Sequence, residues 1–312
     1  MELRKLFVKL FLVQNDYSNT TAPNEKADLN SPEWKELYEY ERNRALTVPT
    51  PNNPPWNSLA AFGVWFASVL FILIIPNVFL IPYLLVKGQN LGNSQELMSF
   101  LQKDPAVLLI SIIGIIPAHI LTLVLAWLVV TNYKKFSFRQ TLGWQSGGFA
   151  WWHYVLIIAG FFSVAAVVAH FIPPQENELT RILQSSRAAV FVVAFMATFT
   201  APIVEEVIYR GILYSAFQRK FGVAAAVFIV TALFALVHVP QYYESISTII
   251  LICLLSLVLT LIRVKSDNLL PCIILHTIFN GIQSIAMIAE PYLPVTTPQI
   301  QEQTSAIFKL FT

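Results

Sequence analysis

Seven long apolar runs dominate this chain of 312 residues. A helix needs about 20 mostly apolar residues to cross the hydrocarbon core of a bilayer, and the runs are near or beyond that length. Hydrophobic residues make up 56% of the chain and charged residues 12%, about half the charged fraction of a soluble domain. The sequence therefore predicts an all-α, polytopic membrane bundle. The predicted spans are about 59–85, 106–131, 151–171, 187–217, 222–239, 246–263 and 268–289.

The first and fourth predicted spans are longer than one crossing requires, so tilt or breaks are expected in them. Pro76 and Pro82 are candidate kinks in the first span, and Pro202 is one in the fourth. An eighth membrane-embedded element could lie in either span. We therefore expect seven to eight transmembrane helices.

Polar segments flank the apolar region. We expect residues 1–57 to be a cytoplasmic extension, starting with a short amphipathic helix or a frayed terminus and ending in a proline-rich linker at 48–56. Residues 58–290 would form the transmembrane domain, and 291–312 a C-terminal tail.

Lysine and arginine in the loops predict the orientation, because cytoplasmic loops carry an excess of both. One side has Arg42, Arg44, Lys134, Lys135, Arg139, Arg219, Lys220, Arg263 and Lys265. The other side has Lys87, Lys103, Arg181, Arg187 and Lys309. This imbalance favours a cytoplasmic N-terminus, and we expect an integral protein of a bacterial plasma membrane. The net charge of +2 gives no indication of a nucleic-acid partner.

An acid pair and an arginine interrupt the fourth span. Insertion scales put the cost of a charge at the centre of such a helix at about 2.5–3.5 kcal/mol, so these residues call for a functional explanation. Glu206 and Arg210 are four residues apart and share a helical face, whereas Glu205 is turned about 100° away. The spacing predicts a positioning ion pair between Glu206 and Arg210, with the Glu205 carboxylate free for chemistry.

Two later spans carry further polar residues at helical spacing. His238 follows Phe234 by one turn, and the phenyl ring could shield the imidazole from lipid. His276 and Asn280 share a face of the last span. Counting about 1.5 Å per residue from the connecting turns places these groups at a depth similar to that of Glu205. We predict that they meet inside the bundle.

These residues read as EExxxR, FxxxH and HxxxN, in that order. They resemble the signature motifs of the CPBP family, which groups type II CAAX prenyl endopeptidases with bacteriocin-processing and abortive-infection proteins. The likeness covers about residues 186–290. The residues that carry it are Glu205, Glu206, Arg210, Phe234, His238, His276 and Asn280.

The resemblance implies an intramembrane glutamic endopeptidase. Glu205 with His238 would activate water, and His276 with Asn280 would stabilise the oxyanion, as amide hydrolysis requires. We expect cleavage near the cytoplasmic half of the bilayer, with no cofactor. The substrate would be a membrane-associated peptide or protein, lipidated or not, such as a CAAX tail or a leader peptide. The residues that would position this machinery are Glu206, Arg210 and Phe234.

Two alternatives remain open from the sequence. Two histidines and two glutamates could hold zinc in an intramembrane metalloprotease, although HExxH is absent and Arg210 disfavours a cation beside Glu206. The chain could instead be a non-proteolytic membrane protein, either a proton-coupled transporter or a scaffold. The residues expected to be structural are His119, His153, His170, Cys253 and Cys272.

Overall fold

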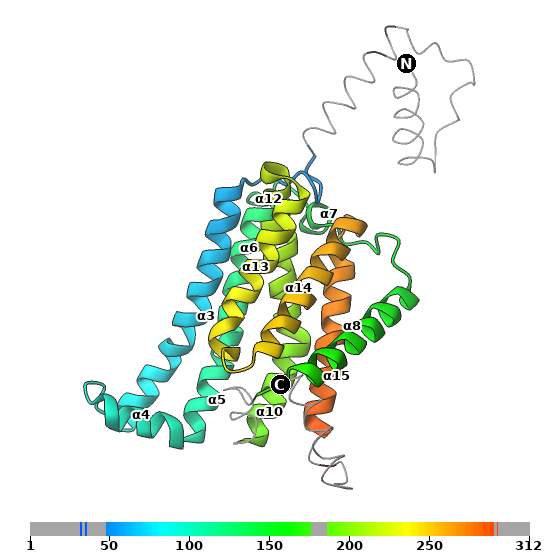
Figure 1. Cartoon of the computed structure of the whole chain (residues 1–312). Helices are drawn as coiled ribbons and strands as arrows, with labels where there is room; N and C mark the ends of the chain where they lie inside the picture. Colours follow the sequence, from blue (N-terminus) through cyan, green and yellow to red (C-terminus); the bar gives the residue numbers. More distant parts are fainter. Residues whose placement is uncertain (1–31, 33–34, 36–47, 176–185, 290–291, 293–312) are drawn as a thin grey trace. The chain divides into compact units, whose positions relative to one another are not determined.

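The computed structural model describes residues 32, 35, 48–175, 186–289 and 292, and every regular element in these residues is a helix (Figure 1). The chain divides into two units, 1–48 and 49–312. Most of the first unit lies outside the described residues, as do the expected N-terminal amphipathic helix and nearly all of the C-terminal tail. The fold below is that of the second unit.

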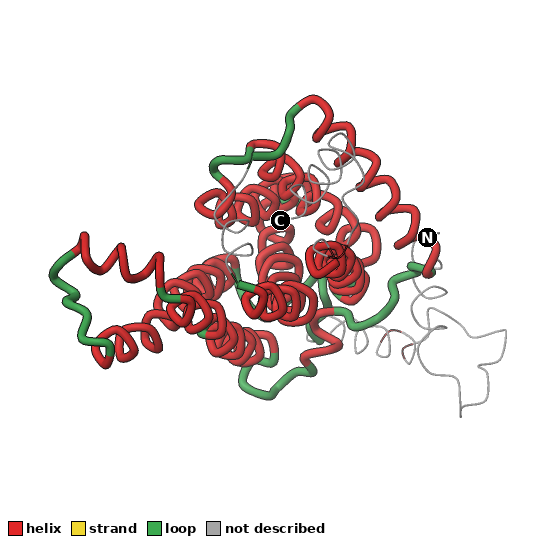
Figure 2. The backbone as a smooth tube through the Cα atoms, turned by 90° about the horizontal axis from the view of Figure 1, so that it is seen from below, coloured by secondary structure: helices red, strands yellow, loops and turns green. Residues whose placement is uncertain are grey.

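Seven of the described helices are long and apolar enough to cross a membrane, which confirms the prediction of an all-α, polytopic bundle. They are α3 (Ser58–Val86), α5 and α6 together (Pro105–Val130), α8 (Trp151–Phe171), the composite helix Arg187–Phe221, α13 (Val223–Tyr242), α14 (Ile246–Ser266) and α15 (Leu270–Ala289). Viewed along the bundle, most of these helices are seen end-on and pack side by side (Figure 2). The chain is an integral membrane protein.

The composite fourth span changes its helical register twice. A π-helical turn has one more residue than an α-helical turn, and such turns occur often at functional sites. Two of them enclose the short α-helix that carries the acid pair. In chain order the parts are α10 (Arg187–Phe195), η2 (Met196–Thr200), α11 (Ala201–Glu206), η3 (Val207–Leu213) and α12 (Tyr214–Phe221).

The predicted kink positions have different outcomes. The helix α3 continues through both Pro76 and Pro82. At Pro76 it packs closely on Gly114, the residue between α5 (Pro105–Ile113) and α6 (Ile115–Val130), where an added Cβ would lie 2.7 Å from the Pro76 Cα atom. Pro202 instead lies in the first turn of α11, directly after the π-turn η2. A register change thus occurs where the sequence suggested a kink.

One end of the bundle is tied down by residues 49–57, which we call the strap. This strap end also holds the short helix α7 (Phe138–Leu142), the turn between α12 and α13, and the turn between α14 and α15 (Figure 1). Hydrogen bonds in both directions join the strap to the bundle. The hydrogen bonds run from Trp56 Nε1 to Ile212 O at 3.0 Å, from Arg219 Nη2 to Trp56 O at 2.8 Å, and from Arg263 Nη2 to Pro51 O at 2.7 Å.

Replacing Trp56 with phenylalanine is expected to lower the free energy of unfolding by about 0.5–1.5 kcal/mol, because the Ile212 carbonyl loses its indole donor while the packing is largely kept. Titration of the purified protein with a denaturing detergent measures this change. An unaltered midpoint would show that the hydrogen bond does not hold the strap.

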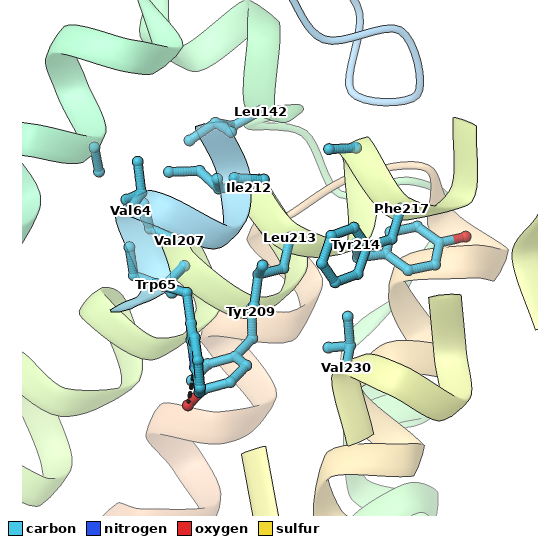
Figure 3. Close-up of a cluster of buried hydrophobic side chains, with 14 of the residues drawn as sticks. Val64, Trp65, Leu142, Val207, Tyr209, Ile212, Leu213, Tyr214, Phe217 and Val230 are labelled. Carbon is cyan, nitrogen blue, oxygen red and sulfur yellow. Dashed lines mark hydrogen bonds between the residues drawn. The ribbon is translucent and has the colours of Figure 1, made fainter. Parts of the chain in front are cut away.

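A large apolar core fills the bundle beneath the strap (Figure 3). Leu142, Ile212, Leu213, Tyr214 and Phe217 are all buried in it. In the same cluster the Trp65 indole donates to the Tyr209 hydroxyl at 3.1 Å, and this pair faces the interior of the bundle. The strap end is therefore densely packed.

The opposite end, which we call the far end, lies where α3 ends and where α13 turns into α14 at residues 243–245. The helix α4 (Ser94–Lys103) runs there across the direction of the spanning helices (Figure 1). Asp104 caps α5 by accepting from the Ala106 amide, and the Tyr83 hydroxyl donates to the same carboxylate at 2.8 Å.

Candidate active site

A cavity of about 590 Å³ lies within the bundle, and all four predicted catalytic side chains line it. Helices far apart in the sequence supply them: Glu205 comes from α11, His238 from α13, and His276 and Asn280 from α15. The lining is mostly apolar. The convergence predicted from the three motifs is therefore present in the structure.

The predicted ion pair between Glu206 and Arg210 is fully buried, and neither residue lines the cavity. Arg210 Nη1 is 2.8 Å from Glu206 Oε1, and both side chains have an exposed fraction of 0%. The other guanidinium donors of Arg210 are also used: Nη2 donates to Ser256 Oγ at 2.8 Å and Nε to Thr260 Oγ1 at 3.2 Å. The Phe234 ring covers the guanidinium at 4.8 Å. Buried charges are tolerated when they are paired and hydrogen-bonded in this way.

His276 lies between the two carboxylates. Its Nδ1 atom is 2.7 Å from Glu206 Oε1, and its Nε2 atom is 3.8 Å from Glu205 Oε2. The HxxxN motif groups His276 with Asn280 and does not predict the contact with Glu206. Because a carboxylate only accepts hydrogen bonds, Nδ1 of His276 carries a proton when Glu206 is ionised. The Nε2 edge of the ring is then directed toward Glu205.

The His238 ring is oriented by its own helix. Its Nδ1 atom is 2.7 Å from the Phe234 carbonyl oxygen, and the Phe234 ring packs on the imidazole with centroids 4.7 Å apart. A carbonyl accepts hydrogen bonds, so Nδ1 is the protonated nitrogen and Nε2 of the neutral ring keeps its lone pair. Glu205 and His238 both line the cavity, but no hydrogen bond or ion pair joins them in the described structure. The predicted water-activating pair therefore has no direct contact between its two side chains.

The Asn280 side chain makes a hydrogen bond that the backbone of Pro202 cannot make. In the π-turn the Ala201 amide donates to Met196 O, five residues back. The same register would pair an amide at position 202 with Ala197 O, but proline has no N–H. The Asn280 Nδ2 atom donates to Ala197 O at 2.9 Å in its place. One of the two Nδ2 hydrogens is thereby used, and the other remains for chemistry.

A double-mutant cycle between these two positions separates structure from chemistry. Asn280→Ala should lower the free energy of unfolding by about 1–3 kcal/mol, because it leaves the Ala197 carbonyl unsatisfied. In a Pro202→Ala background the restored amide can serve that carbonyl, so the same replacement should cost clearly less. Detergent titration of the four proteins measures the coupling. Equal costs in both backgrounds would contradict this account of Asn280.

His119 and Tyr242 also line the cavity, although neither belongs to the three motifs. The Nδ1 atom of His119 is 3.0 Å from Thr200 Oγ1, and both His119 and Tyr242 lie within electrostatic range of Glu205. Tyr242 follows His238 by four residues, so helical spacing could have found it. His119 stands alone in α6, outside every motif, and was grouped with His153 and His170.

The zinc alternative finds little support in the arrangement of possible ligands. Among the described residues, no three His, Cys, Asp or Glu side chains are arranged to hold a metal ion. One oxygen of Glu206 is already shared by Arg210 and His276. A zinc ion on these residues would require the ion pair to rearrange.

The cavity lies in the half of the bundle toward the far end. His238 is the sixteenth residue of α13, about 24 Å from the start of that helix at the strap end. The expected cytoplasmic N-terminus puts the strap end in the cytoplasm, and cleavage was expected in the cytoplasmic half. Cleavage in the cytoplasmic half stays a prediction, because His276, the seventh residue of α15, lies only about 9 Å from the strap-end start of that helix.

Comparison with known proteins finds one family whose model matches part of the chain. Residues 187–282 match the model of the family described as "Type II CAAX prenyl endopeptidase Rce1-like". This match supports the resemblance to the CPBP family, and we call residues 187–282 the CPBP segment. The CPBP segment runs from the start of α10 into α15 and contains all seven residues predicted for the site. His119 and the strap lie outside it. No curated protein and no solved structure matches the chain.

Proposed function

We propose that this protein is an intramembrane endopeptidase in which Glu205 activates the water that attacks a peptide bond. The observation that carries the proposal is the contrast between the two adjacent acids. Glu206 is fully buried and bound by Arg210 and His276, whereas the Glu205 side chain is 24% exposed and lines the cavity. The match of the CPBP segment to an endopeptidase family supports the same reaction class.

The geometry suits general base catalysis by Glu205 with His238 as its partner. A water molecule held between the Glu205 carboxylate and the lone pair on His238 Nε2 would give up a proton as it attacks the carbonyl carbon. The direct contact between the two residues is absent, so the water itself would join them. The apolar lining keeps competing water away from the reacting groups.

The developing oxyanion would be stabilised by His276 and Asn280. His276, held through Nδ1 by the Glu206 carboxylate, would donate from Nε2 when both ring nitrogens are protonated. The free hydrogen of Asn280 Nδ2 would be the second donor. Arg210 compensates the charge of Glu206, so the buried part of the site is not left with an uncompensated carboxylate. When the tetrahedral intermediate collapses, the C–N bond breaks and the proton taken from water by Glu205 passes to the leaving amine.

Reconstitution of the purified protein into liposomes that carry membrane-tethered peptides tests this function. We expect cleavage at defined bonds, and we expect it to persist after treatment with a metal chelator. Loss of cleavage on chelation, together with zinc in the purified protein by elemental analysis, would favour the metalloprotease. Substrate-linked proton flux without cleavage, surviving in Asn280→Ala, would instead indicate a transporter, because a proton relay needs no oxyanion donor.

A further inference from the structure

We propose that the cavity is reached from the far end of the bundle, and that the enzyme acts on uncharged, extended peptide segments at the extracytoplasmic face of the membrane. This inference rests on the proposed protease function and adds the side of the membrane and the substrate class. Three independent features of the structure support it.

The cavity extends to the far end. Its lining includes Tyr242, the last residue of α13, and Thr248, the third residue of α14. It also includes Met287, which lies two residues before the end of α15. Each of these three helices has its other end at the strap end. The cavity therefore runs from the catalytic groups toward the turn at 243–245.

The route from the strap end is blocked. No residue of the strap, of α7 or of α12 lines the cavity. Between the strap and the cavity lie the buried side chains of Leu142, Ile212 and Leu213, together with the fully buried Glu206–Arg210 pair. The strap itself is held over this core by Arg219 and Arg263. A peptide coming from that side would have to displace a packed core and a paired charge.

The two ends differ in charge. The described loops and helix ends at the strap end contain Lys134, Lys135, Arg139, Arg219, Lys220, Arg263 and Lys265. At the far end they contain Lys87, Lys103 and Arg187. Because lysine and arginine accumulate on the cytoplasmic side, the strap end is the cytoplasmic end. The catalytic cavity then belongs to the extracytoplasmic half.

The lining near the far end indicates the kind of segment that would bind. It carries the amides Gln241 and Gln283 and the hydroxyls of Thr248 and Ser284, and apolar side chains lie among them. The Gln241 and Gln283 amides can pair with the backbone of an extended peptide, whereas the two hydroxyls already form hydrogen bonds within the bundle. Among the described residues of the lining there is no lysine or arginine that could receive a terminal carboxylate. An internal segment with small or apolar side chains, of an exported or membrane-anchored chain, fits this surface.

Thiol labelling of intact cells tests the side and the access route. In a full-length protein with Cys253 and Cys272 replaced by alanine, single cysteines are introduced as Tyr243→Cys in the exposed far-end turn, Gln283→Cys in the cavity and Lys220→Cys at the strap end. The matched control for the cavity position is Ile282→Cys, the adjacent residue, which is exposed and does not line the cavity. A maleimide that cannot cross membranes is the probe.

We expect Tyr243→Cys and Gln283→Cys to react in intact cells, and Lys220→Cys only after permeabilisation. Gln283→Cys should react at least about tenfold faster than Ile282→Cys, because a thiol needs water to form the reactive thiolate. Reaction of Lys220→Cys in intact cells would overturn the orientation. Reaction of Gln283→Cys only after permeabilisation would overturn the access route.

Cleavage by oriented vesicles separates this inference from the proposed function. A tethered peptide presented on the far-end side should be cut, and the same peptide presented on the strap side should not. Cleavage only on the strap side, abolished by Glu205→Gln, would overturn the side and keep the protease. If neither peptide is cut while labelling follows the expected pattern, the protease proposal fails and this substrate assignment fails with it.

Discussion

Replacing Glu205 with glutamine is expected to reduce peptide cleavage by about 10²–10⁴-fold, the contribution typical of a general base. The replacement keeps the size of the side chain and removes only its ability to take a proton. Within the part of the chain that the structure describes, Glu205 makes no hydrogen bond and its nearest charged contact is His276 at 3.8 Å, so the folded protein should lose little stability. Cleavage of a tethered peptide in liposomes and detergent unfolding measure the two effects on the same samples.

The adjacent acid provides a matched control. Glu206→Gln makes the same chemical change one residue away, but Glu206 is fully buried and bound by Arg210 and His276. We expect this variant to lose both activity and stability. The diagnostic result is therefore a difference between the two variants: Glu205→Gln should lose activity but stay folded, whereas Glu206→Gln should lose both activity and stability. If Glu205→Gln cleaves at the wild-type rate, Glu205 is not the base and the proposed mechanism is wrong.

The transmembrane architecture could be predicted because hydropathy reports directly on which segments avoid water. All seven predicted spans correspond to described helices, and the largest shift at an end is four residues, at the C-terminal end of the Arg187–Phe221 helix. The contact between Glu206 and Arg210 could also be predicted, because residues four apart in one helix lie on the same face in any surroundings. The spans and this ion pair can therefore be predicted from residue spacing and the length of apolar runs, without a tertiary structure.

Contacts between helices were harder to predict. Spacing places His276 and Asn280 on one face, but only the rotation of α15 against α11 and η2 decides that His276 meets Glu206 and that Asn280 meets Ala197 O. The two π-turns shift the register by backbone hydrogen bonding, which has no hydropathy signal. Pro202 was the visible sign of the first of them. His119 enters from α6, which has no motif to single it out.

The composition of the strap does not predict its hydrogen bonds with the bundle. Its prolines and asparagines are typical of a free linker, yet its backbone carbonyls accept from Arg219 and from the buried Arg263. An extended proline-rich segment makes few hydrogen bonds to itself, so its carbonyls are available to neighbouring donors. Long-range pairing of this kind requires the fold. It is the strap that gives the buried Arg263 guanidinium two of its acceptors, Pro51 O and Asn52 Oδ1.

Replacing Arg210 with methionine is expected to lower the free energy of unfolding by about 3–5 kcal/mol, because it leaves the Glu206 carboxylate buried without its cation. Methionine keeps much of the arginine stem and so tests the charge more than the packing. The loss also removes the donors to Ser256 and Thr260, which lie on α14. Detergent titration measures the change, and Arg139→Met, at an exposed arginine of α7, should stay within about 0.5 kcal/mol of wild type.

The double variant Arg210→Met with Glu206→Gln decides whether the lost stability comes from the unpaired charge. Neutralising Glu206 removes the uncompensated carboxylate, so the double variant should be more stable than Arg210→Met alone. Cleavage should nevertheless remain low in the double variant, because His276 would no longer be held by a carboxylate through Nδ1. Stability would then be recovered without activity, as expected if the ion pair both compensates its own burial and orients His276. A double variant no more stable than Arg210→Met would mean that the packing of the arginine, and not its charge, holds η3 against α14.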